Sequence, residues 1–239
     1  MKYSKVFYFI QIFLLSNVAF SQKIATEKNY VWMGYLTQMK INERISMWND
    51  IHWVPENFII LRSGATVSFR HQNKINTTLG IAYAWFYPKE NNTTYRPEIR
   101  PWGQTTLTQK MNQSSLFHRV RYEARYRRTL IDDELTNEFN FNYRVRYLLQ
   151  FKYQINKDSD KIYLVTSDEI LYNIGEEISN SIEFDQNRIM IGAGLHSKNI
   201  TLQIGYLNQL LKISSSTNFN MNHNLYLFVF HDLNWTKKE

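Results

Sequence analysis

Residues 118–128, HRVRYEARYRR, constrain the fold most, because apolar and charged side chains alternate along them with period two. Period two is the side-chain repeat of a β-strand, whereas a helical period would spread the arginines around the whole circumference. One face carries Val120, Tyr122, Ala124 and Tyr126. The stretch is therefore predicted to be a strand with one apolar and one charged face, and not a basic arm for nucleic acid.

Residues 139–154 repeat this arrangement over a longer run. Their apolar face carries Phe139, Phe141, Tyr143, Val145, Tyr147, Leu149, Phe151 and Tyr153. Arg144 and Arg146 fall on the opposite face, together with asparagine, glutamine and lysine. Two neighbouring strands are thus expected to share one apolar and one charged face.

The same alternation continues along most of the chain, with no convincing amphipathic helix between the segments. The candidate strands are residues 30–40, 43–53, 60–71, 76–87, 100–109, 116–130, 137–154, 161–173, 186–197, 199–211 and 223–235. The connections between them, such as QNKIN, NKDSDK and SKN, are polar and typical of turns. The pattern predicts a run of up-and-down hairpins in one domain.

The first residues have the composition of an export signal. Two lysines precede the apolar run at 6–15, and AFS at 19–21 supplies small residues for a signal peptidase. The apolar stretch is shorter than the roughly 20 residues that a membrane-spanning helix needs. Residues 1–21 are therefore predicted to be a signal peptide, and residues 22–239 an outer-membrane β-barrel.

Composition excludes several classes of protein. The chain has no cysteine, which leaves neither a lipoprotein anchor nor a disulfide framework. A mean hydropathy of −0.45, without a second long apolar run, argues against a helical membrane protein. The net charge of +7 suits nucleic acid, an anionic membrane surface or an anionic ligand in a lumen, and export argues against nucleic acid.

Strand length separates the remaining architectures. Strands of soluble sandwiches usually have about 5–6 residues, whereas transmembrane strands have about 9–11 or more. The candidate strands are long, and aromatic residues gather near their ends, where the interfacial girdles of a membrane barrel lie. The fold expected is all-β, a single up-and-down antiparallel transmembrane barrel. Because bacterial single-chain barrels close with an even strand number, twelve strands are expected, with ten as the alternative.

Nearly the whole mature chain carries motifs in a distinctive order. They are YVWMGYLTQMKINERISMW, LGIAYAWF, PEIRPWGQ, HRVRYEARYRR, FNYRVRYLLQF, SDEILYN, DQNRIMIGAGLH and ITLQIGYLNQL. In this order they resemble the Bacteroidetes outer-membrane barrels grouped as domain of unknown function 2490. The resemblance implies a Gram-negative outer-membrane location. It transfers no catalytic residue, because the family has no known activity.

The charged faces predict what lines the lumen. Six arginines confined in a closed barrel would repel one another at low effective dielectric, so carboxylates or mobile anions must accompany them. The expected lumen charge ladder consists of Arg119, Arg121, Glu123, Arg125, Arg127, Arg144, Arg146, Asp168 and Glu169. Glu98, Glu183 and Asp185 are near enough in the strand order to reach inward as well. An arginine surplus predicts weak anion preference in an open channel.

A lipid-modifying hydrolase is the alternative function. Such a site needs a hydroxyl nucleophile activated by a histidine and a carboxylate. The candidates are His196 beside Ser197, His223, and the carboxylates Asp168, Glu169 and Asp185. The pair at 196–197 falls at a predicted periplasmic turn, the wrong end for lipid A, so no catalytic residue is assigned and no enzyme is expected. Histidines without ligand spacing, and the lack of a Gly-rich phosphate loop, predict no metal or cofactor.

The sequence leaves two main functions open. The barrel could be a small porin-like channel for anionic solutes, or a structural or docking protein plugged by its own side chains. Pore radius depends on strand number and shear, which alternation does not reveal. The expected partners are outer-membrane lipid and small anionic solutes, and not nucleic acid.

Overall fold

The computed structural model describes residues 23–70, 74–88, 93–156, 159–175, 181–213 and 218–235. These residues form eleven β-strands. The strands are β1 (Lys23–Lys40), β2 (Ile45–Val54), β3 (Phe58–Arg70), β4 (Lys74–Phe86), β5 (Arg96–Met111), β6 (Ser114–Ile131), β7 (Glu134–Asn156), β8 (Ser159–Gly175), β9 (Ser181–Ser197), β10 (Ile200–Lys212) and β11 (Asn218–Asn234). This part of the chain contains no helix long and apolar enough to cross a membrane. The predicted signal peptide lies outside the described residues.

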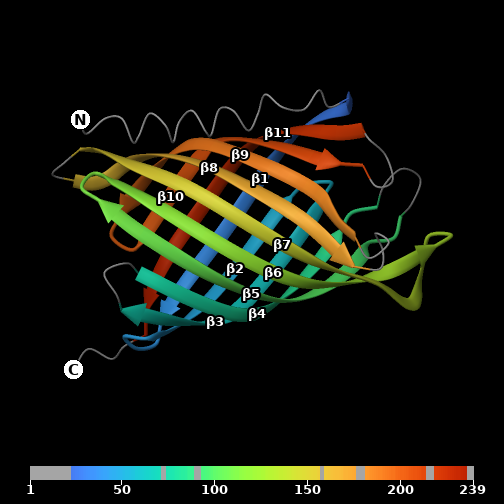
Figure 1. Ribbon diagram of the computed structural model, residues 1–239, viewed down its shortest axis with the longest axis horizontal. Helices are drawn as coiled ribbons and strands as arrows, with labels where there is room; N and C mark the ends of the chain where they lie inside the picture. Colours follow the sequence, from blue (N-terminus) through green and yellow to red (C-terminus); the bar gives the residue numbers. More distant parts are fainter. Residues whose placement is uncertain are drawn as a thin grey trace.

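The strands close into one barrel in which neighbours in sequence are neighbours in space (Figure 1). Consecutive strands are antiparallel, and β1 closes the barrel by pairing in parallel with β11. At this closure Trp32 lies opposite Tyr226, and Gly34 lies opposite Phe228. The predicted all-β, up-and-down barrel is confirmed.

The strand number differs from the twelve expected. Each of the eleven candidate segments corresponds to one of the eleven strands that the structure describes. The even number followed from a rule for barrels that are antiparallel throughout. Parallel pairing of β1 with β11 removes that condition, because both strands then run from the same end of the barrel to the other.

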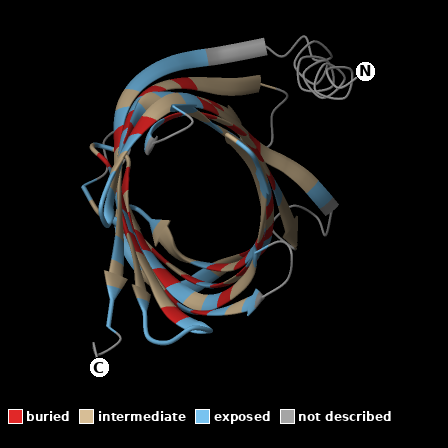
Figure 2. Cartoon of the chain, turned by 90° about the vertical axis from the view of Figure 1, so that its left-hand side faces the viewer, coloured by how far each residue is buried: buried red, intermediate tan, exposed pale blue. Residues whose placement is uncertain are grey.

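Alternation divides every strand between the lumen and the outer surface. Arg121 on β6 lies opposite Arg146 on β7, and both are buried. The adjacent pair, Tyr122 and Val145, faces outward, and Tyr122 is exposed. In Figure 2 the buried positions form bands along the barrel wall. Most buried residues are polar or charged, so this barrel is polar inside and apolar outside.

The two ends of the barrel differ in the length of their connections. One end, where β1 begins, has the longer connections at residues 87–95, 176–180 and 213–217, together with short ones at 55–57 and 132–133. The other end has the two-residue turns at 112–113 and 198–199. Asn112 and Lys198 adopt positive φ there, a conformation that short hairpin turns require.

Candidate functional site

The lumen wall holds eight of the nine residues of the predicted ladder. Five come from β6, two from β7 and one from β8. They are Arg119, Arg121, Glu123, Arg125, Arg127, Arg144, Arg146 and Glu169. The strict alternation of β6 and β7 places them there, because every second side chain of a strand points to the same face.

Asp168 is the exception, and its predicted place in the lumen is wrong. Adjacent side chains of a strand point to opposite faces, so Asp168 and Glu169 do not share the lumen. Asp168 pairs with Leu149 and Ile189 on the outer face. There it accepts a hydrogen bond of 2.5 Å from Nδ2 of Asn187. The lumen position belongs to Glu169.

Glu98 on β5 binds two arginines at once. Its carboxylate accepts hydrogen bonds from Nε and Nη2 of Arg100 at 2.6 and 3.0 Å. It also accepts from Nε and Nη2 of Arg125 at 2.5 and 3.1 Å. Glu98 is 0% exposed, so both bidentate pairs are shielded from water. One carboxylate neutralises one of the two guanidinium charges, which leaves the trio positive.

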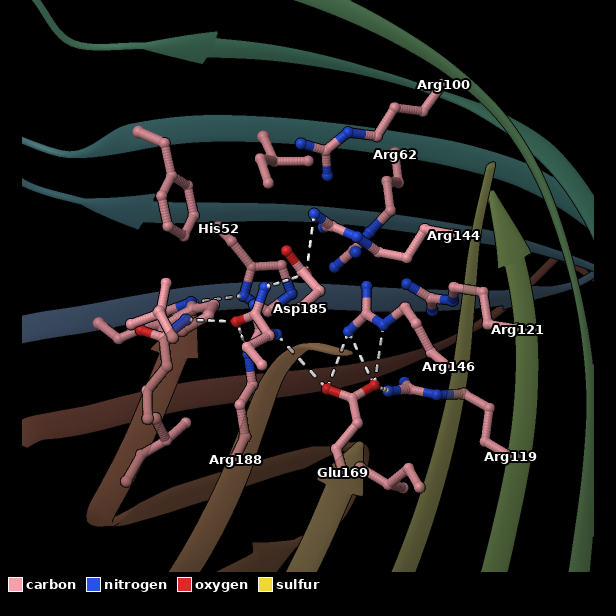
Figure 3. A pocket seen from close by; sticks show the side chains of 18 of the residues that line it. His52, Arg62, Arg100, Arg119, Arg121, Arg144, Arg146, Glu169, Asp185 and Arg188 are labelled. Carbon is pink, nitrogen blue, oxygen red and sulfur yellow. Dashed lines mark hydrogen bonds and ion pairs between the residues drawn. The ribbon is translucent and has the colours of Figure 1, made fainter. Parts of the chain in front are cut away.

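Arg146 connects two further carboxylates. Its Nη1 donates to Glu123 at 2.8 Å, and its Nε and Nη2 donate to Glu169 at 2.9 Å. Arg119 also donates to Glu169, from Nη2 at 2.7 Å. Figure 3 shows Glu169 below the guanidinium of Arg146, with Arg119 at its side. These contacts form an arginine–carboxylate network across β6, β7 and β8.

Arg121 has the least complete set of partners in this network. Its Nε and Nη2 both donate to the side-chain oxygen of Gln104, at 3.0 and 2.7 Å. Its guanidinium lies 4.8 Å from the ring centroid of Trp102, a cation–π contact. The Nη1 atom is buried without a hydrogen-bond partner. The nearest carboxylate oxygen, from Glu123, is 3.8 Å away.

Several lumen residues were not predicted from the sequence. They are Asp50, His52, Arg62, Arg100, Gln104 and Arg188. Asp50 on β2 accepts from Nε of Arg62 on β3 at 2.7 Å. Period two did place Asp50 and His52 on one face of their segment. The opposite face is mostly apolar, with Ile45, Met47, Ile51 and Trp53, so the same alternation was the signal that could have found both residues.

A cavity of about 1010 Å³ follows the lumen. Its lining reaches from Arg96 and Lys212, at the end with longer connections, to Leu36 and Lys152, near the other end. Ten arginines line it: Arg62, Arg96, Arg100, Arg119, Arg121, Arg125, Arg127, Arg144, Arg146 and Arg188. Three carboxylates share the lining, namely Glu169, Glu183 and Asp185. Asp50, Glu98 and Glu123 contact the arginines from within the wall.

The family model described as protein of unknown function (DUF2490) matches residues 29–220. The chain belongs to this family. The match confirms the domain that the sequence resembles, and it extends from β1 into β11. Comparisons with curated proteins and with solved structures gave no match. Because the DUF2490 description assigns no activity, the roles of individual residues depend on the geometry of the lumen.

The DUF2490 barrel does not bring the candidate hydrolase residues together. His196 and Asp185 lie near opposite ends of β9, about 36 Å apart at the usual rise per strand residue. His196 instead contacts the hydroxyl of Thr201 at 2.7 Å, beside the β9–β10 turn. His223 contacts the hydroxyl of Tyr206 on the outer face. Among the described residues, no cluster of three or more histidine or carboxylate side chains suits a metal ion.

Proposed function

We propose that this protein is an outer-membrane barrel that conducts small anionic solutes through its arginine-lined lumen. The observation that carries the proposal is a single cavity whose lining includes residues near both ends of the barrel. A barrel plugged in the middle would divide that space. The cavity therefore favours a channel over a purely structural or docking barrel.

The outer surface supports placement in a membrane. Aliphatic side chains at the middle of several strands are more than half exposed: Leu79, Ile81, Val120, Ile191, Ile204 and Leu225. Exposed aliphatic side chains on so many strands are unusual in contact with water and typical of the lipid-facing band of a membrane barrel. Together with the predicted signal peptide, this surface favours the outer membrane of a Gram-negative bacterium, and lipid as a partner.

The two barrel ends suggest the orientation. Short turns of outer-membrane barrels face the periplasm, and long connections face outward. Residues 87–95 would then lie outside the cell, and the turn at 198–199 would lie in the periplasm. Cysteine at Tyr95 should react with an impermeant maleimide on intact cells, and cysteine at Lys198 should react only after lysis. The reverse result would invert the orientation.

Charge supports selectivity for anions. The cavity lining contains ten arginines and two lysines, whereas the carboxylates that line it or contact its arginines number six. Rings of basic side chains select anions in other pores by lowering the energy of an anion at the constriction. Small anionic solutes are therefore the proposed cargo.

Planar-bilayer recording of the purified protein tests the channel directly. With a potassium chloride gradient across the membrane, the reversal potential should show chloride permeating more readily than potassium. Replacement of Arg62 by glutamine should reduce that preference. A membrane that stays silent after verified insertion would reject conduction and leave the structural or docking barrel.

Labelling tests the assignment of the two faces. Cysteine at Arg125 should react with a small water-soluble thiol reagent, while cysteine at Ala124 should be accessible to quenchers dissolved in lipid. Intact mass should show that the mature chain starts at Gln22, and the protein should fractionate with the outer membrane. Recovery of the protein from the soluble periplasm would overturn the proposed location.

A further inference from the structure

We infer that the arginines at the middle of the lumen form a binding site for a multivalent oxyanion, with the phosphate group as the best fit. The inference deepens the proposed function and rests on it, because the solute would reach the site through the lumen. The site is centred on Arg121 and bordered by Arg62, Arg119 and Arg188. These side chains come from β3, β6 and β9, so they surround the space from different walls.

Arg121 supplies the first donors. It is 1% exposed, and Gln104 and Trp102 hold its guanidinium in place. Both N–H groups of its Nη1 remain without a hydrogen-bond partner. A buried charged group with unpaired donors is costly unless a ligand or water completes its contacts. Arg121 is therefore both positioned and unsatisfied.

The neighbouring arginines contribute further donors. Nε of Arg119 is buried without a hydrogen-bond partner, although Nη2 of the same residue binds Glu169. Arg62 contacts Asp50 through Nε, at 2.7 and 3.0 Å. Arg121 lies near enough to Arg62 and Arg119 for their charges to interact. Figure 3 shows Arg62 and Arg121 extending from different strands toward the same part of the lumen.

Arg188 borders the same space from β9. Its guanidinium lies 4.9 Å from the ring centroid of Trp32, and its Nε donates to Gln186 at 2.9 Å. Among the described residues, its one carboxylate contact is long, 3.4 Å to Glu169. Because Glu169 is shared with Arg119 and Arg146, its single negative charge does not neutralise Arg188.

The carboxylates of the wall are already engaged by other arginines. Glu169 accepts from Arg146 as well as Arg119, and Glu123 accepts from Arg146 through Oε1. Oε2 of Glu123 is a free acceptor, but its single negative charge is shared between Arg146 and Arg121. Water can accept the remaining hydrogen bonds, yet it does not neutralise the surplus positive charge. A mobile anion does both.

The geometry of guanidinium selects the kind of anion. Its planar fork of N–H groups matches two oxygens of a carboxylate or phosphate, whereas an ammonium acts as a point charge. A tetrahedral oxyanion presents oxygens in several directions and can meet forks from three walls at once. Chloride has no such oxygens, and a carboxylate presents two in one plane. Phosphate and sulfate should therefore bind more tightly than acetate or chloride.

Calorimetry on the purified full-length barrel in detergent micelles tests the site, with inorganic phosphate as the probe in a chloride background of constant ionic strength. Saturable binding that sulfate displaces and acetate does not is the expected result. Arg121→Gln should weaken phosphate binding by about tenfold or more, because charge-assisted hydrogen bonds are lost. Arg121→Lys should remain weaker than the unmodified protein, because it restores the charge without the fork.

Lys152→Gln is the matched control, because it removes a lumen charge close to the short-turn end, where the lysine lies 4.8 Å from the Tyr163 ring. It should leave phosphate affinity nearly unchanged. An equal loss in both variants would overturn a localised site in favour of general lumen charge. Arg119→Gln provides a second variant, should circular dichroism show that Arg121→Gln does not fold.

Two outcomes separate this inference from the proposed function. Phosphate binding in micelles by a protein that is silent in planar bilayers would reject the channel and support the site. Chloride conductance without saturable phosphate binding would support the channel and overturn the site.

Discussion

Two regions of the lumen wall differ in how their buried polar groups find partners. The charged wall, the inner face of β5 to β8, is built from arginines and carboxylates such as Glu98, Arg121 and Arg146. The aromatic–amide wall, the inner face of β10, β11 and β1, carries tyrosine, tryptophan, asparagine and glutamine. Its buried members include Trp32, Gln203, Gln209, Asn222, Asn224 and Tyr226.

The aromatic–amide wall satisfies its polar groups locally and without charge. Tyr163 of β8, which packs against this wall, donates from its hydroxyl to Gln203 at 3.1 Å, and Gln203 donates to the hydroxyl of Tyr226 at 3.4 Å. Gly192 and Gly194 make room for the two tyrosine rings, because a Cβ at either glycine would overlap a tyrosine side chain. This wall therefore needs no ligand to be complete.

The charged wall does not satisfy all of its polar groups in this way. Its guanidinium groups outnumber the carboxylates that contact them, and Arg121 keeps unpaired donors. The comparison shows that most guanidinium groups lie on the charged wall, and that Arg62 of β3 and Arg188 of β9 extend the positive charge beyond its two edges. The middle of the inner face of β10, β11 and β1 carries neutral groups. An anion passing through the lumen would follow the charged wall.

The largest effect should come from removing a carboxylate of the charged wall. Glu98→Gln leaves Arg100 and Arg125 buried without their counter-charge, and the expected loss of stability is about 3–5 kcal/mol. The free energy of unfolding measures this loss, with tryptophan fluorescence following the reversible unfolding of the barrel from a lipid bilayer. Gln203→Glu is the reciprocal change, which places a charge in the neutral wall and should also destabilise. Unchanged stability of Glu98→Gln would show that water already screens the trio.

A charge on the outer side of the charged wall should cost slightly less. Val145 lies on the outer face near the middle of β7, and Val145→Arg is expected to cost about 2–4 kcal/mol if this surface meets lipid. Val145→Ala is the control for loss of the valine side chain. Equal stability of the two variants in a bilayer would contradict the lipid-facing assignment. The contrast between the two walls would then concern only the inner faces of the strands.

Overpacking should expose the dependence of the aromatic–amide wall on glycine. Gly192→Ala is expected to cost about 1–3 kcal/mol, because its Cβ would overlap the hydroxyl of Tyr226. Adding Tyr226→Phe should recover part of the loss, since it removes the overlapping oxygen. Recovery should be partial, because the Cβ also meets the backbone carbonyl of Ile204. Strict additivity in the double variant would show that the tyrosine does not lie against the glycine.

The smallest effect concerns a contact between the β6–β7 turn and the residues that precede β5, at the end of the barrel with the longer connections. The Asp133 carboxylate, in the β6–β7 turn, accepts hydrogen bonds from the hydroxyl and backbone N–H of Thr93 at 2.7 and 2.8 Å. These bonds and one from the backbone of Thr94 lower the pKa of Asp133. The contact should therefore be complete above the ordinary aspartate pKa and should weaken as pH falls through the lowered value. Amide exchange at Thr93 and Thr94 measures it.

Asp133→Asn is the control for that titration. It should leave exchange at both threonines independent of pH once the intrinsic exchange rate is taken into account. A pH dependence that persists in Asp133→Asn would assign the effect to another group at this rim.

The fold could be predicted largely from local pattern. Alternation in 118–128 and 139–154 assigned Arg121, Tyr122 and Val145 to their faces, because a strand has only two faces and each position determines the next. The same rule, applied consistently, would have excluded Asp168 from the lumen once Glu169 was placed there. Position in the strand, and not charge, decides which of two adjacent carboxylates points inward.

The sequence by itself determined the class of fold, the family, and the separation of apolar and charged faces, because these depend on periodicity within single segments. Only the tertiary structure decided how the barrel closes, since parallel pairing of β1 with β11 joins segments from opposite ends of the chain. It also decided which arginines share Glu98 and Glu169, and that the Nη1 donors of Arg121 have no hydrogen-bond partner. Those contacts depend on register between strands, and register is set by the whole closed barrel rather than by any one segment.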